Sequence, residues 1–128
     1  MAILEANSIK SNSSSFNSPI AFQTSSGTEN GQLARVWVNF DASGTIRASF
    51  NVSSVTDNGV GSWTVNFSNS LVDANASVLY TNSREEYNYP YNPNAVCNSV
   101  ASGNAGVVNW VETVGAFDSG QNFVAVFR

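Results

Sequence analysis

Apolar and polar residues alternate along three stretches in the middle of the chain, at residues 36–40, 48–52 and 63–67. Successive side chains of a strand leave opposite faces of a sheet, so a period of two predicts strands with one buried face. We expect strands at about residues 32–40, 46–55 and 61–67. In each strand the alternating apolar side chains should face the interior. They are Val36, Val38 and Phe40; Ala48, Phe50 and Val52; Trp63, Val65 and Phe67.

Turn residues separate these strands from one another. Residues 41–45 form a compact connection in which Gly44 suits a positive φ, and Asp57-Asn58-Gly59 favours a hairpin turn because Asn and Gly tolerate positive φ. Further strands are expected at residues 77–81, 95–101, 107–114 and 123–128. Seven or eight short strands without helical periodicity predict an all-β chain that folds as an antiparallel sandwich or barrel. Of these two we expect the sandwich, of jelly-roll type.

The last strand, FVAVFR, carries apolar residues at both parities. A strand that is apolar on both sides is usually buried on both sides. We therefore expect this strand to lie in the centre of the sandwich, or to turn one face toward another subunit.

The N-terminal segment differs from the rest of the chain. Residues 11–15 are Ser and Asn only, and such a run cannot bury apolar surface. We expect residues 1–18 to form a flexible arm and residues 19–128 to form the sandwich domain. The arm is either a frayed terminus or an attachment segment whose apolar residues dock on a neighbouring subunit; the candidate attachment residues are Ile3, Leu4 and Ile9.

Composition excludes several kinds of partner. Charged residues make up 11% of the chain, the formal net charge is −4, and the five basic residues are scattered. Nucleic-acid and anionic-membrane binding both need a basic patch, so we expect neither partner. The N-terminus lacks the basic start and apolar run of a signal peptide, so we expect synthesis in the cytosol without an export tag.

Little in the sequence points to catalysis. The chain has no His, which is the commonest general base and metal ligand, and its single Cys lacks a partner for a disulfide. The Asp57-Asn58-Gly59 segment lacks the downstream acidic residues of a calcium loop, and the adjacent Glu85 and Glu86 should point apart in an extended loop. We expect no enzyme activity, no metal and no cofactor.

One loop is a candidate for binding. Residues 82–93 contain three alternating tyrosines, which would face one way in an extended conformation. Aromatic rings with polar neighbours stack on sugars and anchor protein interfaces, so this loop either contacts glycan, contacts a protein, or packs on its own domain. The candidate contact residues are Tyr87, Tyr89, Tyr91 and Arg84.

The WVNF motif at residues 37–40, IRASFNVSSVTDNGVGSWTVNF at 46–67, DAN at 73–75 and VAVFR at 124–128 resemble a family of small bacteriophage virion proteins. These proteins are usually described as tail-fibre or structural proteins. The similarity covers residues 24–67 and the last strand. The turn at 41–45 is shorter than the usual form, and residues 76–106 carry no family motif.

The resemblance implies a non-enzymatic virion structural protein that assembles in the host cytoplasm. It implies a homotrimeric fibre, spike or appendage attached to capsid, neck or tail proteins. The first alternative is a capsid decoration protein that stabilises the head. The second is a carbohydrate-binding module for host-surface glycan.

Overall fold

The computed structural model describes residues 20–24, 27–31, 33–83, 94–111 and 115–128. The chain divides into two compact units, Met1–Leu33 and Ala34–Arg128. In the first unit, β1 (Ile20–Thr24) and β2 (Gly27–Gly31) form an antiparallel hairpin. The predicted arm over residues 1–18 lies outside the described residues.

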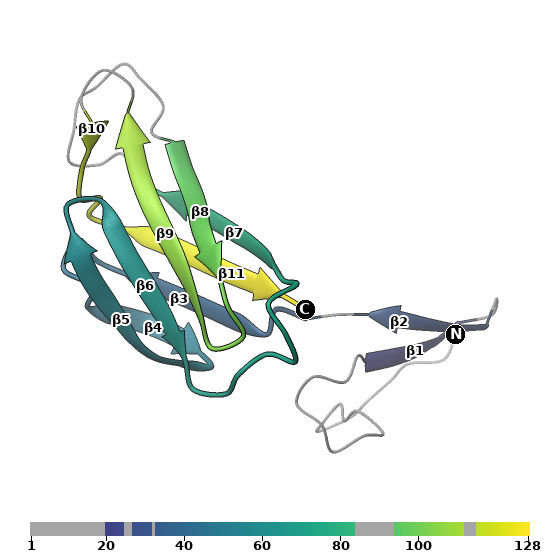
Figure 1. Ribbon diagram of the computed structural model, residues 1–128. Coiled ribbons are helices and arrows are strands. Elements are labelled where there is room, and N and C mark those ends of the chain that lie inside the picture. Colours follow the sequence, from purple (N-terminus) through teal and green to yellow (C-terminus); the bar gives the residue numbers. More distant parts are fainter. Residues whose placement is uncertain (1–19, 25–26, 32, 84–93, 112–114) are drawn as a thin grey trace. The chain divides into compact units, whose positions relative to one another are not determined.

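The second unit contains two antiparallel sheets (Figure 1). The four-stranded sheet has the order β4-β3-β11-β7, with β3 at Val36–Phe40, β4 at Ile46–Phe50, β7 at Ser77–Asn82 and β11 at Asn122–Phe127. The five-stranded sheet comprises β5 at Val52–Gly59, β6 at Ser62–Phe67, β8 at Asn94–Val100, β9 at Asn104–Val111 and β10 at Gly115–Ala116. In this sheet β5, β6, β9 and β8 are successive neighbours, and the short β10 pairs with the end of β9. The all-β prediction is confirmed, and the two sheets are consistent with a β-sandwich.

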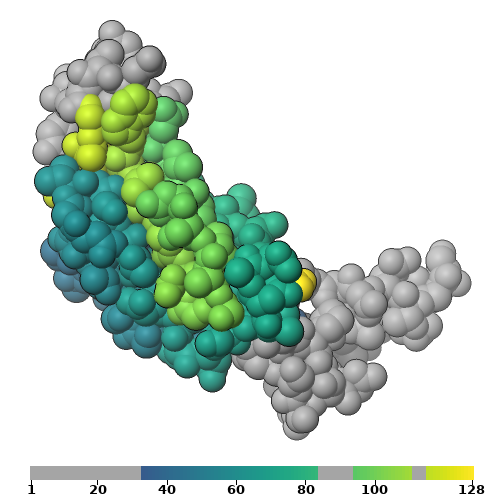
Figure 2. All heavy atoms as spheres, viewed as in Figure 1, coloured from purple at the N-terminus to yellow at the C-terminus, as the bar shows by residue number. Residues whose placement is uncertain are grey.

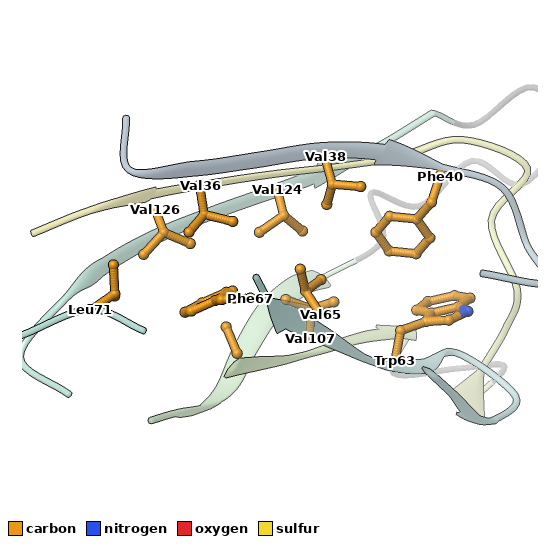
Figure 3. Packing of buried hydrophobic residues seen from close by; sticks show 11 residues of the cluster. Val36, Val38, Phe40, Trp63, Val65, Phe67, Leu71, Val107, Val124 and Val126 are labelled. Atoms are coloured by element: carbon orange, nitrogen blue, oxygen red, sulfur yellow. The ribbon is translucent and has the colours of Figure 1, made fainter. Parts of the chain in front are cut away.

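Inward side chains of both sheets form one hydrophobic core (Figure 3). The alternation predicted for β3 and β6 is confirmed, because every second residue of each strand is buried. Burial of these apolar side chains is the main favourable contribution to folding. The fully or nearly buried members are Val36, Val38, Phe40, Trp63, Val65, Phe67, Leu71, Ala105, Val107, Val124 and Val126.

The strand predicted at residues 46–55 is two strands in different sheets, and Asn51 makes the change. Asn51 has a φ of 57°, a left-handed conformation that Asn tolerates better than most residues. Its Nδ2 donates to the carbonyl oxygens of Arg35 (3.2 Å) and Asn69 (3.0 Å), and its Oδ1 accepts from the Asn69 amide (2.8 Å). Val52 packs against the core as expected, but Phe50 is exposed on the outer side of the four-stranded sheet. The expectation that these two residues share a buried face is therefore wrong.

The turn between β5 and β6 lies two residues later than predicted. Residues 57–59 belong to β5, and the pairing of Gly59 with Ser62 places the turn at Val60 and Gly61. Gly61 adopts a φ of 68°, which glycine reaches without the steric cost of a Cβ. The connection at residues 41–45, by contrast, agrees with the prediction of a positive φ at its glycine, whose φ is 80°.

Candidate functional site

All binding residues predicted from the sequence lie outside the described residues. How these residues are arranged relative to one another therefore stays a prediction. They are Tyr87, Tyr89, Tyr91 and Arg84 of the tyrosine loop, and Ile3, Leu4 and Ile9 of the arm.

The described part of the chain offers a different candidate, a row of apolar residues across the outer face of the four-stranded sheet. The register places Phe50 of β4 beside Trp37 of β3, Trp37 beside Ala125 of β11, and Ala125 beside Leu79 of β7. Cross-strand neighbours on one face have Cβ atoms about 5 Å apart, so these side chains form a continuous stripe. Their exposed fractions are 47% for Phe50, 42% for Trp37 and 60% for Leu79.

A second row of outward side chains lies on the same face, two residues along each strand from the first row. The same register brings together Ala48, Asn39, Phe123 and Thr81 in the strand order β4-β3-β11-β7. Phe123 is 37% exposed, and it lies on the same face of β11 as Ala125 of the first row, two residues away. We call these two rows together the apolar face.

The apolar face carries no charge. Among the described strands that form it, no outward position of either row holds a charged residue. Arg47, at the bulge of β4, donates to the carbonyl oxygen of Gly120 before the start of β11. Lone exposed apolar residues are ordinary, whereas a contiguous apolar patch is a candidate surface for contact with another molecule.

The outer face of the five-stranded sheet, which is turned toward the viewer in Figure 2, is more polar. Asn66 of β6 donates from Nδ2 to Ser54 Oγ (3.1 Å) and Thr56 Oγ1 (3.0 Å) of β5. Asn58 Nδ2 donates to Thr64 Oγ1 at 2.8 Å. These polar side chains form hydrogen bonds with one another across the two strands. This part of the surface therefore presents polar groups to the solvent. The exposed apolar residues Val96 and Trp110 lie on β8 and β9 of the same sheet.

A hydrogen-bonded polar cluster lies between the sheets. Asn109 and Asn122 are fully buried, and the single hydroxyl proton of Tyr80 has two acceptors within reach, Asn109 Oδ1 at 2.5 Å and Asn122 Oδ1 at 2.7 Å. Asn82 Nδ2 donates to Asn109 Oδ1 at 2.6 Å, and Asn122 Nδ2 donates to the carbonyl oxygen of Ser119 at 2.8 Å. Burial raises the pKa of Tyr80 far above its usual value of 10.0. The cluster holds no group that titrates near neutral pH, so its role is to hold β7, β9 and β11 together.

Three further observations concern the Cys97 thiol, metal binding and membrane-spanning helices. Burial raises the pKa of the Cys97 thiol, which lowers its thiolate fraction and its reactivity. Within the described residues no group of three or more His, Cys, Asp or Glu residues could hold a metal ion. No helix in that part of the chain is long and apolar enough to span a membrane.

Asp73 and Arg128 form an ion pair between the segment after β6 and the end of β11. Arg128 donates from Nε to Asp73 Oδ1 (2.6 Å) and from Nη2 to Oδ2 (2.5 Å). The hydrogen bonds from Arg128, and then the one from the Asn75 amide, lower the pKa of Asp73 well below its usual 3.8. A carboxyl whose pKa is depressed by folding stabilises the fold above its unfolded pKa and loses this contribution as the pH falls.

Asp73→Asn should therefore be less stable than the wild type at neutral pH. The difference in free energy of unfolding should shrink as the pH falls below about 4, where the carboxyl of the unfolded chain takes up its proton. Urea unfolding at a series of pH values measures it. A difference that stays constant from about pH 7 to about pH 2 would contradict the ion-pair explanation.

No family model, no curated protein and no solved structure matches the chain. The resemblance to phage virion proteins therefore rests on the sequence motifs alone.

Sequence reasoning missed the apolar face as a site, although one signal for it was present. β11 has Val124 and Val126 buried on one face and Phe123 37% exposed on the other, so within one chain the strand is not buried on both sides, and the alternative that its second face meets another subunit stays a prediction. The remaining members, Trp37, Phe50 and Leu79, come from three other strands. Only the strand register shows that they are neighbours.

Proposed function

We propose that the protein is a bacteriophage virion structural protein, a homotrimeric fibre, spike or appendage module attached to the particle. The observation that carries the proposal is the apolar face. Copies of a structural module must bury apolar surface against one another, and this face exposes Trp37, Phe50, Leu79 and Phe123 on one side of the sheet.

The motifs that resemble phage virion proteins occupy the structural centre of the second unit. The WVNF motif lies in β3, the segment at residues 52–67 forms the β5–β6 hairpin, and the VAVFR motif lies in β11. β3 and β11 are neighbours in the middle of the four-stranded sheet, and their outward residues Trp37 and Ala125 pair in the apolar face. The same motifs therefore contribute to both the core and the surface that we propose for assembly.

We further propose that the sandwich is of jelly-roll type. In support, the first and last strands of the second unit, β3 and β11, lie side by side. The hairpins β3–β4, β5–β6 and β8–β9 each remain in one sheet, whereas most consecutive strands of a jelly roll change sheets, so the pairing of β3 with β11 is the one feature of the topology that supports this type.

The attachment and contact sites stay as predicted from the sequence. Residues 1–18 would attach the module to capsid, neck or tail proteins through Ile3, Leu4 and Ile9. The loop with Tyr87, Tyr89 and Tyr91 would face outward. A capsid decoration protein would use the same apolar face for assembly and differs only in its place on the particle.

A carbohydrate-binding module is the second candidate, and the five-stranded sheet favours it. Trp110 is 45% exposed on a sheet whose outer face also presents hydroxyls and amides. An aromatic ring stacks on a sugar ring, while hydroxyls and amides exchange hydrogen bonds with sugar hydroxyls.

Imaging of purified virions that carry a label on this protein tests the proposal. We expect the label at a fixed position on the particle, and its absence from particles would contradict a virion role.

Particles that lack the protein should be intact but adsorb poorly if it forms a fibre, and should be fragile if it decorates the capsid. Deletion of residues 1–18 should abolish incorporation, and Ala at Tyr87, Tyr89 and Tyr91 should reduce adsorption if the loop contacts the host.

A further inference from the structure

We propose that Asn58 is a site of spontaneous deamidation, in which the backbone nitrogen of Gly59 attacks the Asn58 side chain, and that hydrogen bonds to Asp57 and Thr64 restrain this reaction. Water is the only co-reactant, and the product carries a carboxylate in place of an amide. The inference concerns the β5–β6 hairpin and is independent of the proposed virion role.

Deamidation proceeds through a cyclic imide. The Gly59 nitrogen loses its proton and bonds to Asn58 Cγ, the bond from Cγ to Nδ2 breaks, and Nδ2 leaves as ammonia with that proton. Water then opens the ring at Cγ, which gives aspartate, or at the backbone carbonyl carbon of residue 58, which gives isoaspartate. Overall, asparagine and water become aspartate or isoaspartate and ammonia.

Sequence and exposure make Asn58 the asparagine of the second unit that we expect to react first. Its neighbour Gly59 has no Cβ to hinder the approach of the backbone nitrogen. The sequence contains one other Asn-Gly pair, Asn30-Gly31, which lies in the first unit. Asn58 and Gly59 are both exposed, and a Cβ on Gly59 would meet no atom within 4 Å beyond its chain neighbours. Water and base therefore reach the atoms that react.

The backbone at Asn58 is also less constrained than that of its neighbours. The register pairs Asp57 with Trp63 and Gly59 with Ser62, so Asn58 is the extra residue of a β-bulge and has no partner of its own on β6. Among the described strands, β5 is at the edge of its sheet. The backbone of residue 58 can therefore rotate toward the cyclic imide with little loss of strand pairing.

Two hydrogen bonds oppose the reaction. The Gly59 amide donates to Asp57 Oδ1 at 2.8 Å, and Asn58 Nδ2 donates to Thr64 Oγ1 at 2.8 Å. The first bond holds the proton that must leave, and it places a negative charge beside the nitrogen that must become negative. The second directs the Asn58 side chain toward β6. Each bond must break before the ring closes, and a bond to a charged group is the stronger kind.

The reaction would change the outer face of the five-stranded sheet. Either product lacks the Nδ2 donor to Thr64 and adds one negative charge beside Asp57, in a chain whose net charge is −4. Isoaspartate also lengthens the backbone of β5 by one methylene group. We therefore expect the modified hairpin to pair less well than the original one.

The test is the rate of modification of residue 58 in the purified full-length protein, kept in mildly alkaline buffer. Fragmentation mass spectrometry locates the change, and an isoaspartyl methyltransferase detects the isoaspartate. The wild type should gain both products at residue 58. Asp57→Ala should raise the rate about tenfold, because a hydrogen bond to a charged group no longer has to break. Asp57→Asn keeps an acceptor oxygen for the Gly59 amide and should restore most of the protection.

Thr64→Val and Thr56→Val form a matched pair of variants. The two threonines are opposite each other on β5 and β6, and the hydroxyl of each accepts from an asparagine Nδ2, that of Asn58 for Thr64 and that of Asn66 for Thr56. Thr64→Val should raise the rate at residue 58 about threefold, whereas Thr56→Val should leave it unchanged. Equal rates in the two variants would overturn the proposal.

The same measurements in urea separate the effect of the fold from that of the local sequence. The unfolded chain lacks both hydrogen bonds, so Asn58 should react faster there, and Asp57→Ala should no longer differ from the wild type. In the folded variants, Asn69 should react as slowly as in the wild type, which excludes general unfolding as the cause. A rate that Asp57→Ala leaves unchanged or lowers in the folded protein, or a residue 58 that stays unmodified in both proteins, would each overturn the proposal.

Discussion

Replacement of Trp63 by alanine is expected to lower the free energy of unfolding by about 3–5 kcal/mol. Trp63 is fully buried, and its ring packs edge to face on Phe40 with ring centroids 5.7 Å apart (Figure 3). Its Nε1 also donates to the carbonyl oxygen of Ala42 at 3.1 Å. The alanine variant loses the apolar contacts, leaves a cavity between the sheets and removes the partner of that carbonyl.

Urea unfolding followed by circular dichroism measures this loss. Trp110→Ala is the matched control, because Trp110 is nearly half exposed on β9 and its removal should cost less than about 1 kcal/mol. Equal losses for the two variants would contradict the assignment of Trp63 to the core and of Trp110 to the surface.

Gly61→Ala should destabilise the protein by about 3–4 kcal/mol, the sum of left-handed backbone strain and steric overlap. Gly61 has a φ of 68°, and a Cβ there would lie 2.8 Å from the carbonyl oxygen of Asn109 and 2.8 Å from the amide nitrogen of Phe117. Both neighbours are backbone atoms, which cannot turn aside as a side chain can. The Gly61 amide also donates to Asp118 Oδ1 at 2.7 Å, so a shift of the turn would break this bond.

Two other glycines separate the contributions. Gly59 has a φ of 114°, but a Cβ there would meet no atom within 4 Å beyond its chain neighbours, so Gly59→Ala should show the backbone strain alone. Gly103 is not in the left-handed region, and the nearest atom to its Cβ position is Ser70 Oγ at 3.6 Å, so Gly103→Ala should be close to neutral. Thermal unfolding of the three variants should give the order Gly61, Gly59, Gly103 from largest loss to smallest. A Gly61 variant as stable as the Gly103 variant would contradict the close approach.

Local sequence patterns predicted where the strands lie better than they predicted which strands pair in a sheet. The strands around Val36 and Trp63 follow a period of two because each has one face in the core, and this period is visible in the sequence. The pattern failed at Asn51, where one residue with positive φ sends the chain to the other sheet. The alternation of Phe50 and Val52 continues unbroken through this point, so nothing in the period marks the change. The Asn51 side chain donates to the carbonyl oxygen of Arg35 and accepts from the amide of Asn69, and both residues are distant from it in sequence.

The candidate site was less accessible to sequence reasoning than the fold. Tyr80, Asn109 and Asn122 form a buried cluster only because three strands converge, and an isolated Asn in a strand is no guide to burial. The apolar face has the same origin, since Trp37, Phe50 and Leu79 are far apart along the chain and become neighbours through register.

The sequence by itself determined that the chain is all-β, that its strands are short and antiparallel, and that its last strand is apolar on both sides. These properties depend on the spacing of neighbouring residues, which governs which side of a strand each side chain occupies. Only the tertiary structure decided which strands share a sheet and which of two apolar sides is buried. That choice depends on pairing between distant strands, and it is this pairing that leaves Trp37, Leu79 and Phe123 together on the outer face.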